Sequence, residues 1–430
     1  MTSRFHWALF ISTFTLAGCG GLFDPGPLSY VESPRLKTEL QGREAMQEKV
    51  RGALARLFGP NPREIHVPAG AGLPLGGARL ANYRHFEDGT EKPQAIARIV
   101  DPKQPPVTQV MRGGFALYRE HCLHCHGVSG AGDGPTAPFL YPRPRDYRKG
   151  LFKFTSTNTG AKPTRDDLEK TLRYGLHGTS MPAFDASLSD GEIAQVVDYV
   201  IFLSMRGEAE LALIDEAMTA DDKDPEALSE TVATEVAGNV FNKWKAAATL
   251  VMNPPIPKPP STRESILRGR NLFLGGTAKN KVGQPVKGDC IDCHGPRAEG
   301  DGNSFVPQNV FNTVVFGGDP STRNERLQAF DEKVRTKWKE SLDDWGEPLR
   351  PANLNRGVYK GGRRPIDLYW RIAKGINGAK MPAHYPANDP EMIWDLVNFV
   401  LALPQEPKLL EDAVVPPAPT APAPKVAATK

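Results

Sequence analysis

Four of the five cysteines in this 430-residue sequence lie in two copies of one pattern, Cys-x-x-Cys-His, at residues 122–126 and 290–294. The spacing indicates covalent attachment of haem c, because each thiol can bond one vinyl group and the histidine can then be an axial ligand of the iron. A thioredoxin-like redox motif does not need the histidine, and a zinc site would need a second pair of ligands. The sequence therefore predicts two covalently bound haem c groups. Their attachment residues are Cys122, Cys125, His126, Cys290, Cys293 and His294.

The chain contains an internal repeat the size of a domain. The two haem motifs align with a shift of 168 residues, and Arg143-Pro144 aligns with Arg350-Pro351 with a shift of 207. Further on, Met181-Pro182-Ala183 aligns with Met381-Pro382-Ala383 with a shift of 200. Agreement at so many positions predicts two copies of one fold. The change from 168 to 207 places a net insertion of 39 residues within about 303–349 of the second copy.

Helical patterns flank each motif. A helical stretch over Gln109–His121 comes before the first pair of cysteines. A capping-box pattern at 189–192 then opens a helix whose apolar residues recur at helical spacing from Ile193 to Ile201. The second copy repeats this apolar pattern from Ile393 to Leu401. We interpret both apolar stripes as core residues.

On these motifs, each copy resembles a class I cytochrome c domain, and the pair resembles a bacterial di-haem cytochrome c. The resemblance covers about 105–206 and 262–404. It implies a mostly α fold of two tandem class I cytochrome c domains with long loops and linkers. It also implies a methionine opposite each histidine, so that the axial pairs are His126 with Met181 and His294 with Met381. A thioether ligand raises the reduction potential of haem iron, which suits an electron carrier.

The first residues resemble a bacterial lipoprotein signal. Arg4 precedes a mostly apolar run, which ends in Leu16-Ala17-Gly18-Cys19. The resemblance implies cleavage before Cys19, lipidation of its thiol and export to the periplasmic face of a bacterial membrane. An ordinary secretory signal is the alternative. No run of 18 apolar residues predicts a membrane-spanning helix.

These observations divide the chain into six parts. We expect a signal peptide at 1–19, an N-terminal extension or spacer at 20–104, a first haem domain at 105–206, a linker at 207–261, a second haem domain at 262–404 with its insertion, and a disordered tail at 405–430. The linker begins as an acidic segment and ends in a Pro-rich stretch at 254–260.

Charge is unevenly distributed along the chain. The formal net charge of +3 is too small to predict nucleic-acid binding. Segments 141–175 and 349–380 carry net charges of +5 and +7, and we expect their basic faces, including Arg363, Arg364 and Lys374, to guide docking of redox partners. Arg143 and Arg350 recur in the repeat, and they either pair with haem propionates or form turns.

Two functions fit the sequence. The leading one is a di-haem electron carrier, such as a subunit of a quinol-oxidising complex or a terminal oxidase, with redox proteins of a respiratory chain as partners. The alternative is a di-haem enzyme such as a peroxidase or a thiosulfate dehydrogenase. Such enzymes typically use an open haem or a cysteine ligand, whereas here both methionines are present and no cysteine is left over. Electron transfer is therefore favoured over independent catalysis, and no catalytic residue is assigned.

Overall fold

A computed structural model describes most of the chain. The described residues are 28–62, 64–68, 70–73, 83–85, 91–93, 95–98, 107–110, 113–224, 226–384 and 389–411. Cys19, the signal peptide and most of the predicted tail lie outside them. No helix in the described part is both long and apolar enough to cross a bilayer.

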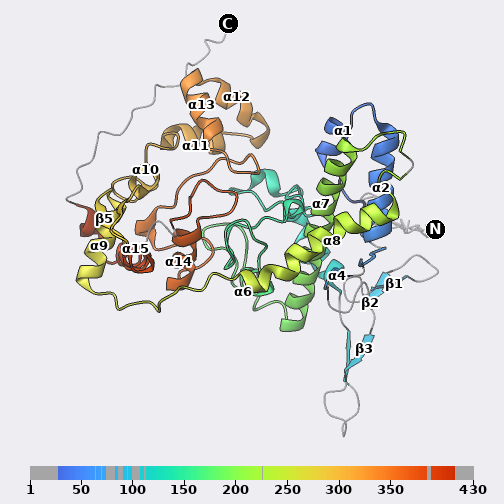
Figure 1. The fold of residues 1–430 in the computed structure, drawn as a ribbon, viewed down its shortest axis with the longest axis horizontal. Helices are drawn as coiled ribbons and strands as arrows, with labels where there is room; N and C mark the ends of the chain where they lie inside the picture. The colour runs from blue at the N-terminus through green and yellow to red at the C-terminus, as the bar shows by residue number, and fades with distance from the viewer. Residues whose placement is uncertain are drawn as a thin grey trace, which may run out of the picture.

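The described elements are mainly helices, which confirms the expected mostly α fold (Figure 1). The helices of the first part are α1 Pro34–Glu39, α2 Glu44–Phe58, α4 Gly114–His121, α5 Leu123–His126, α6 Arg165–Tyr174, α7 Asp190–Thr219 and α8 Glu230–Ala246. Those of the second part are α9 Arg263–Phe273, α10 Cys290–His294, α11 Gln308–Phe316, α12 Arg323–Gln328, α13 Glu332–Glu340, α14 Pro365–Lys374 and α15 Pro390–Ala402.

Strands form three short antiparallel ribbons. The pairs are β1 Tyr83–His85 with β2 Glu91–Pro93, β3 Ala95–Arg98 with β4 Val107–Val110, and β5 Thr277–Lys279 with β6 Pro285–Lys287. Strand β4 occupies residues that we expected to begin the first helix, so α4 starts only at Gly114.

Helix α7 is the longest helix described, and it extends beyond the first haem domain that we expected to end at residue 206. It begins at the predicted capping box, where Ser189 accepts from the Glu192 backbone and the Glu192 carboxylate accepts from Ser189. Its buried stripe continues through Leu213 and Ile214. Gly207 does not end the helix. A Cβ at this position would clash with Arg148, so the glycine allows close packing at a helix face.

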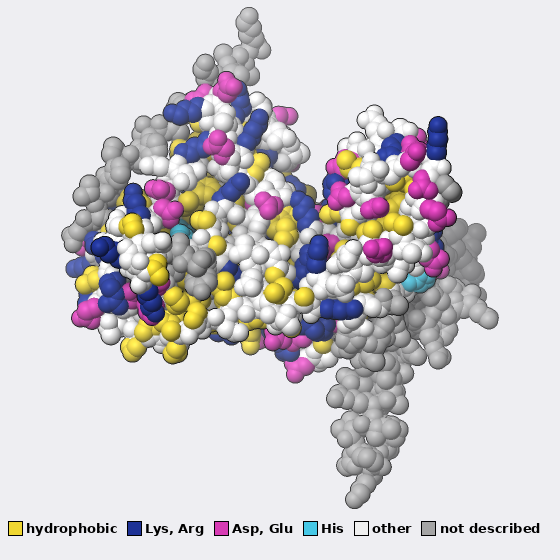
Figure 2. All heavy atoms as spheres, in the orientation of Figure 1, with side chains coloured by type: hydrophobic (Ala, Val, Ile, Leu, Met, Phe, Trp, Pro, Cys, Tyr) yellow, Lys and Arg dark blue, Asp and Glu magenta, His cyan; other side chains and the backbone are white. Residues whose placement is uncertain are grey.

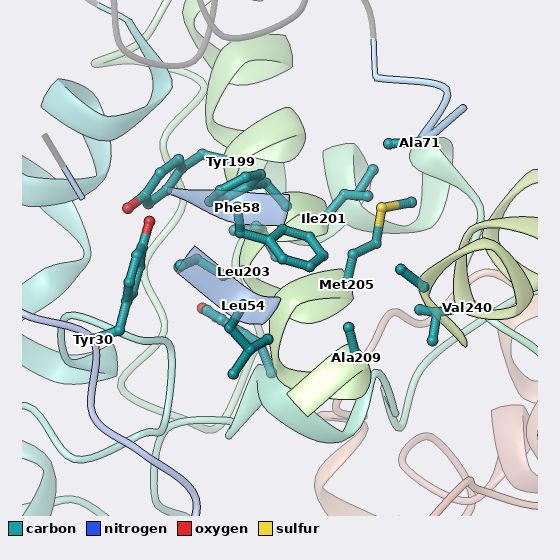
Figure 3. Close-up of a cluster of buried hydrophobic side chains, with 14 of the residues drawn as sticks. Tyr30, Leu54, Phe58, Ala71, Tyr199, Ile201, Leu203, Met205, Ala209 and Val240 are labelled. Atoms are coloured by element: carbon teal, nitrogen blue, oxygen red, sulfur yellow. The ribbon is translucent and has the colours of Figure 1, made fainter. Parts of the chain in front are cut away.

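The N-terminal helices and α8 pack on α7 and share its core. Phe58 of α2 lies 5.7 Å from Phe202 of α7 and 6.2 Å from Phe241 of α8, measured between ring centroids. Figure 3 shows Phe58 among side chains of α7, with Tyr30 and Val240 at the edge of the same cluster. The described parts of 28–73 and 207–250 are therefore built onto the first haem unit, whereas we expected a spacer and a linker.

The second haem unit repeats the central packing of the first. Helix α4 crosses α7 at Gly114, where a Cβ would clash with the carbonyl oxygen of Gln195. Helix α9 crosses α15 at Gly269, where a Cβ would clash in the same way with Asp395. Because both crossings require glycine, the two copies share one helix-packing geometry.

Helices α11, α12 and α13 lie inside the predicted insertion and form a small core of their own. Phe311 and Trp338 are both buried in it. Tyr141 of the first unit reaches this core, with ring centroids 5.3 Å from Phe311 and 5.6 Å from Phe316. The insertion therefore contacts the first haem unit as well as its own.

Counterpart positions of the repeat meet where the two units touch. A Cβ on Gly361 would lie 2.5 Å from the ring of Phe154, and these positions correspond under the shift of 207 residues. Arg371 also lies 5.6 Å from the centre of the Phe154 ring. Self-contact of this kind is typical of positions on the axis of a two-fold symmetric dimer.

Candidate functional site: two haem-binding units

The first Cys-x-x-Cys-His motif is folded as the short helix α5. His126 is buried, and its ring stacks on Tyr147 with the centroids 4.7 Å apart. The Nδ1 atom lies 3.1 Å from the carbonyl oxygen of Arg145, so that Nδ1–H donates to this carbonyl. Burial lowers the pKa of His126 to about 4. The imidazole is therefore neutral near pH 7, with Nε2 left to bind a metal ion.

A cavity of about 600 Å³ opens beside this histidine. Its volume lies within the range of roughly 300–1,000 Å³ that cofactor sites occupy. Three haem-attachment residues and Met181 line it together. The remaining wall is largely apolar and includes Leu140, Phe152, Leu168, Leu172, Phe184, Val197 and Val200.

The chemistry of this cavity fits haem c. Cys122 and Cys125 are free thiols, and burial raises the pKa of Cys122 to about 12, so that it is uncharged. Thioether attachment to these two sulfur atoms, with His126 and Met181 binding the iron, would use all four side chains. These ligand assignments stay predictions, but the fold does bring the four side chains to one cavity.

The loop before Met181 is fixed by its backbone. The Leu176 N–H donates to the Met181 carbonyl at 3.1 Å, and the Met181 N–H donates to Thr179 Oγ1 at 3.1 Å. Gly175 has a φ of +65°, and a Cβ there would lie only 2.6 Å from the Met181 carbonyl oxygen. Glycine is therefore needed at this position for the loop to hold the methionine.

The second motif, in α10, has the same local geometry. His294 Nδ1 lies 3.1 Å from the carbonyl oxygen of Ala352, the repeat counterpart of Arg145. The Ile376 N–H donates to the Met381 carbonyl at 3.2 Å, and Gly375 again has a positive φ, +73°. Cys290 and Cys293 are free thiols. The same hydrogen bonds thus orient the candidate histidine and methionine of both units.

His384 lies beside the second motif. Its ring nitrogen, a carboxylate oxygen of Asp289 and the sulfur of Cys290 lie within 4.8 Å of one another. Such a trio could hold a metal ion if Cys290 were free. Haem attachment would consume the Cys290 thiol, and Phe184 stands at the corresponding position of the first unit, so we assign His384 no ligand role.

The two recurring arginines are both engaged by the insertion. Arg143 lies 3.4 Å from Glu347, and Arg350 donates to Gln308 Oε1 at 2.9 Å. Both line the first cavity. Pairing with propionates remains a prediction for them, since each already has a polar partner.

The basic segments are not simply exposed docking faces. Lys374 is 2% exposed and donates to Thr155 Oγ1 of the first unit, and Arg364 is paired with Asp367. Lys170 of the first unit also pairs with Asp367. The expectation that Lys374 guides a partner was wrong, because the lysine is buried where the two units meet. On the face shown in Figure 2, basic and acidic side chains are interspersed.

The fold and the cavity define a c-type cytochrome domain. Residues 109–200 match the family model described as cytochrome c oxidase, cbb3-type, subunit III. This match implies covalently bound haem c and supports a role in haem electron transfer. Among solved structures, a chain of the reducing HAO-like protein complex of Kuenenia stuttgartiensis is similar, at 24% identity and a TM-score of 0.44, with 69% of this chain and 97% of that chain covered. None of the curated proteins compared with the sequence matches it.

Proposed function

We propose that the protein is a di-haem c-type cytochrome that carries electrons on the periplasmic face of a bacterial membrane, where Cys19 anchors it through lipid. The observation that carries the proposal is the repeated site. Each unit has a Cys-x-x-Cys-His motif whose histidine Nδ1 is 3.1 Å from a backbone carbonyl, and a methionine loop closed by one backbone hydrogen bond.

Three features of the site serve electron transfer. The two backbone carbonyls hold His126 and His294 in the tautomer that leaves Nε2 for iron. The thioethers of Met181 and Met381 would also bind the iron, which would favour electron transfer over binding of a substrate. Haem bound in this way supplies reversible one-electron chemistry. The apolar cavity wall excludes water, which favours a high potential.

The respiratory setting and the anchor form part of the same proposal. A lipid-anchored carrier could exchange electrons with a quinol-oxidising complex or a terminal oxidase while staying close to the bilayer. One acyl chain binds a membrane only marginally, and two or more hold a protein stably. The lipobox-like residues ending at Cys19 support such an anchor.

Mass spectrometry of the protein purified from native membranes tests this composition. We expect a mature chain that begins at lipidated Cys19 and carries two haem masses that survive denaturation. The Cys19→Ser variant should retain both haems and lose the lipid, because anchor and haem sites use different cysteines. The chemically reduced protein should then be oxidised by native membranes.

Three outcomes would count against the proposal. One haem per chain would refute the di-haem assignment, and an unmodified N-terminus elsewhere would refute the anchor. Membranes that cannot oxidise the reduced protein, together with turnover of hydrogen peroxide or thiosulfate by the purified chain, would favour the enzyme alternative.

A further inference from the structure

Residues of the second unit form part of the wall of the first haem cavity. They come from the end of the insertion and the loop that follows it, and they include Trp345, Glu347, Pro348 and Lys360. Hydrogen bonds fix this wall in place. Tyr141 Oη donates to the Pro348 carbonyl at 2.9 Å, and Trp345 Nε1 donates to the Asp146 carbonyl at 3.2 Å. The first cavity is therefore incomplete without the second unit.

Trp345 holds a cation at this wall. The guanidinium carbon of Arg145 lies 3.6 Å from the centre of the tryptophan ring, which is a cation–π contact. Burial lowers the pKa of Arg145 to about 10. Among the described residues, no carboxylate forms an ion pair with this arginine. The ring face thus holds the half-buried guanidinium at the cavity wall.

Lys360 adds a second cation from the other unit. Its repeat counterpart is Lys153, which lines the same cavity and is paired with Asp343 at 2.7 Å. Lys360 itself has no ion pair among the described residues. Burial lowers the pKa of Lys360, and the nearby charge of Lys153 lowers it further. Two half-buried cations that line one cavity, without ion-pair partners among the described residues, are placed to bind an anion through charge-assisted hydrogen bonds.

We propose that Arg145, positioned on Trp345, and Lys360 form a carboxylate-binding site that receives the propionates of the haem in the first cavity. The inference rests on the proposed function and goes beyond it, because it makes the second unit part of the first haem site. Arg145 has no counterpart in the second unit, where Ala352 stands at its position. The two haem sites are therefore chemically different.

A cation beside the haem stabilises the reduced state, since reduction adds negative charge. Removing the Lys360 charge should therefore lower the midpoint potential of the first haem. We expect the ratio of reduced to oxidised first haem to fall about threefold at fixed ambient potential, which is about 30 mV at 59 mV per decade for one electron.

The test is a spectroelectrochemical titration of the full chain carrying Lys360→Met. The variants Met181→Ala and Met381→Ala assign the two midpoints, since each should displace one of them. Lys339→Met is the matched control, because Lys339 is an exposed lysine of the insertion that precedes Lys360. The expected result is a lower first midpoint in Lys360→Met only, with the second midpoint unchanged.

The result has clear alternatives. A shift of the second midpoint would mean that Lys360 serves its own unit, and no shift would mean that it contacts neither haem; either outcome overturns the proposed site. Both leave the di-haem assignment intact. That assignment fails separately, if only one midpoint is found in the wild type.

Trp345 is tested as a positioning residue by a pair of substitutions. Trp345→Leu removes the ring face and should lower the first midpoint, because Arg145 is then free to move into solvent. Trp345→Phe keeps a ring face and should restore most of the wild-type value. Equal midpoints in these two variants would show that the ring does not position the arginine.

Discussion

Single residues hold the methionine loops in conformations that other side chains would disturb. Gly175 has φ +65° and ψ −166°, a combination essentially limited to glycine. The close approach of its Cα to the Met181 carbonyl adds a second constraint. Gly375 has the same pair of constraints in the second unit. The loops are therefore positioned by backbone geometry in addition to any bond to iron.

The Gly175→Ala substitution should loosen the first methionine loop. We expect a loss of about 1–3 kcal/mol in the free energy of unfolding. The reduced first haem should also become able to bind carbon monoxide, since Met181 would leave the iron more readily. Denaturant titration and carbon monoxide difference spectra provide the measurements.

Gly191→Ala is the control for this prediction, because a Cβ at Gly191 in α7 meets no atom within 4 Å. If Gly175→Ala and Gly191→Ala behave alike in both measurements, the loop does not depend on glycine.

At the scale of elements, α7 joins parts of the chain that we expected to be separate. It crosses α4 in the haem unit, and it also packs against α1, α2 and α8. Arg43, just before α2, donates to backbone carbonyls at the end of α7, at 2.8 Å to Ala217 and 2.7 Å to Ala220. The N-terminal helices and the haem unit therefore stabilise each other through this one helix.

Phe58→Ala tests this coupling. Truncating a fully buried phenylalanine typically costs about 3–5 kcal/mol. Because Phe58 contacts Phe202 of α7, the loss should appear in unfolding curves followed by absorbance of the first haem as well as by far-ultraviolet circular dichroism. Met218→Ala, at a 48% exposed position of the same helix, should have little effect. An unchanged haem curve in Phe58→Ala would show that the N-terminal helices fold independently.

At the scale of the whole molecule, the two units are joined by buried polar contacts. Lys374 lies in this interface, and Asn377 accepts from the Gly160 N–H at 3.0 Å. Burial lowers the pKa of Lys374 to about 8; the nearby Asp167 raises it and Arg371 lowers it. The folded state therefore prefers the neutral amine more strongly than the unfolded chain does.

This preference predicts a dependence of stability on pH. Between pH of about 8 and 10.4 the unfolded lysine binds more protons than the folded one, so the contribution of Lys374 to stability should rise with pH by up to about 3 kcal/mol. The free energy of unfolding of the wild type, relative to Lys374→Met, should increase across this window. For the exposed-site control Lys380→Met, the difference in free energy of unfolding from the wild type should not change with pH. If the difference for Lys374→Met does not change with pH either, the prediction is contradicted.

The sequence predicted the features that depend on local pattern. The haem motifs, the methionine loops and the capping box of α7 are each encoded within a few residues. The structure confirms the capping box and shows two matching methionine loops, while the haem assignments stay predictions. The sequence did not predict that Lys374 is buried or that Trp345 and Lys360 line the first cavity. These residues lie about 200 positions from the groups that they contact, and no periodicity or motif records such a contact. The repeat also placed the end of the first haem domain at residue 206, and it does not record that α7 continues through Gly207.

The contact between Phe154 and Gly361 has an evolutionary consequence. When counterpart positions of a duplicated unit touch each other, one surface of the unit meets the same surface of its copy. Joining the copies in one chain makes their encounter intramolecular, so that weak contacts suffice to hold them together. The two copies are then free to diverge, and an asymmetric addition such as the α11–α13 insertion can arise in one copy without being imposed on the other.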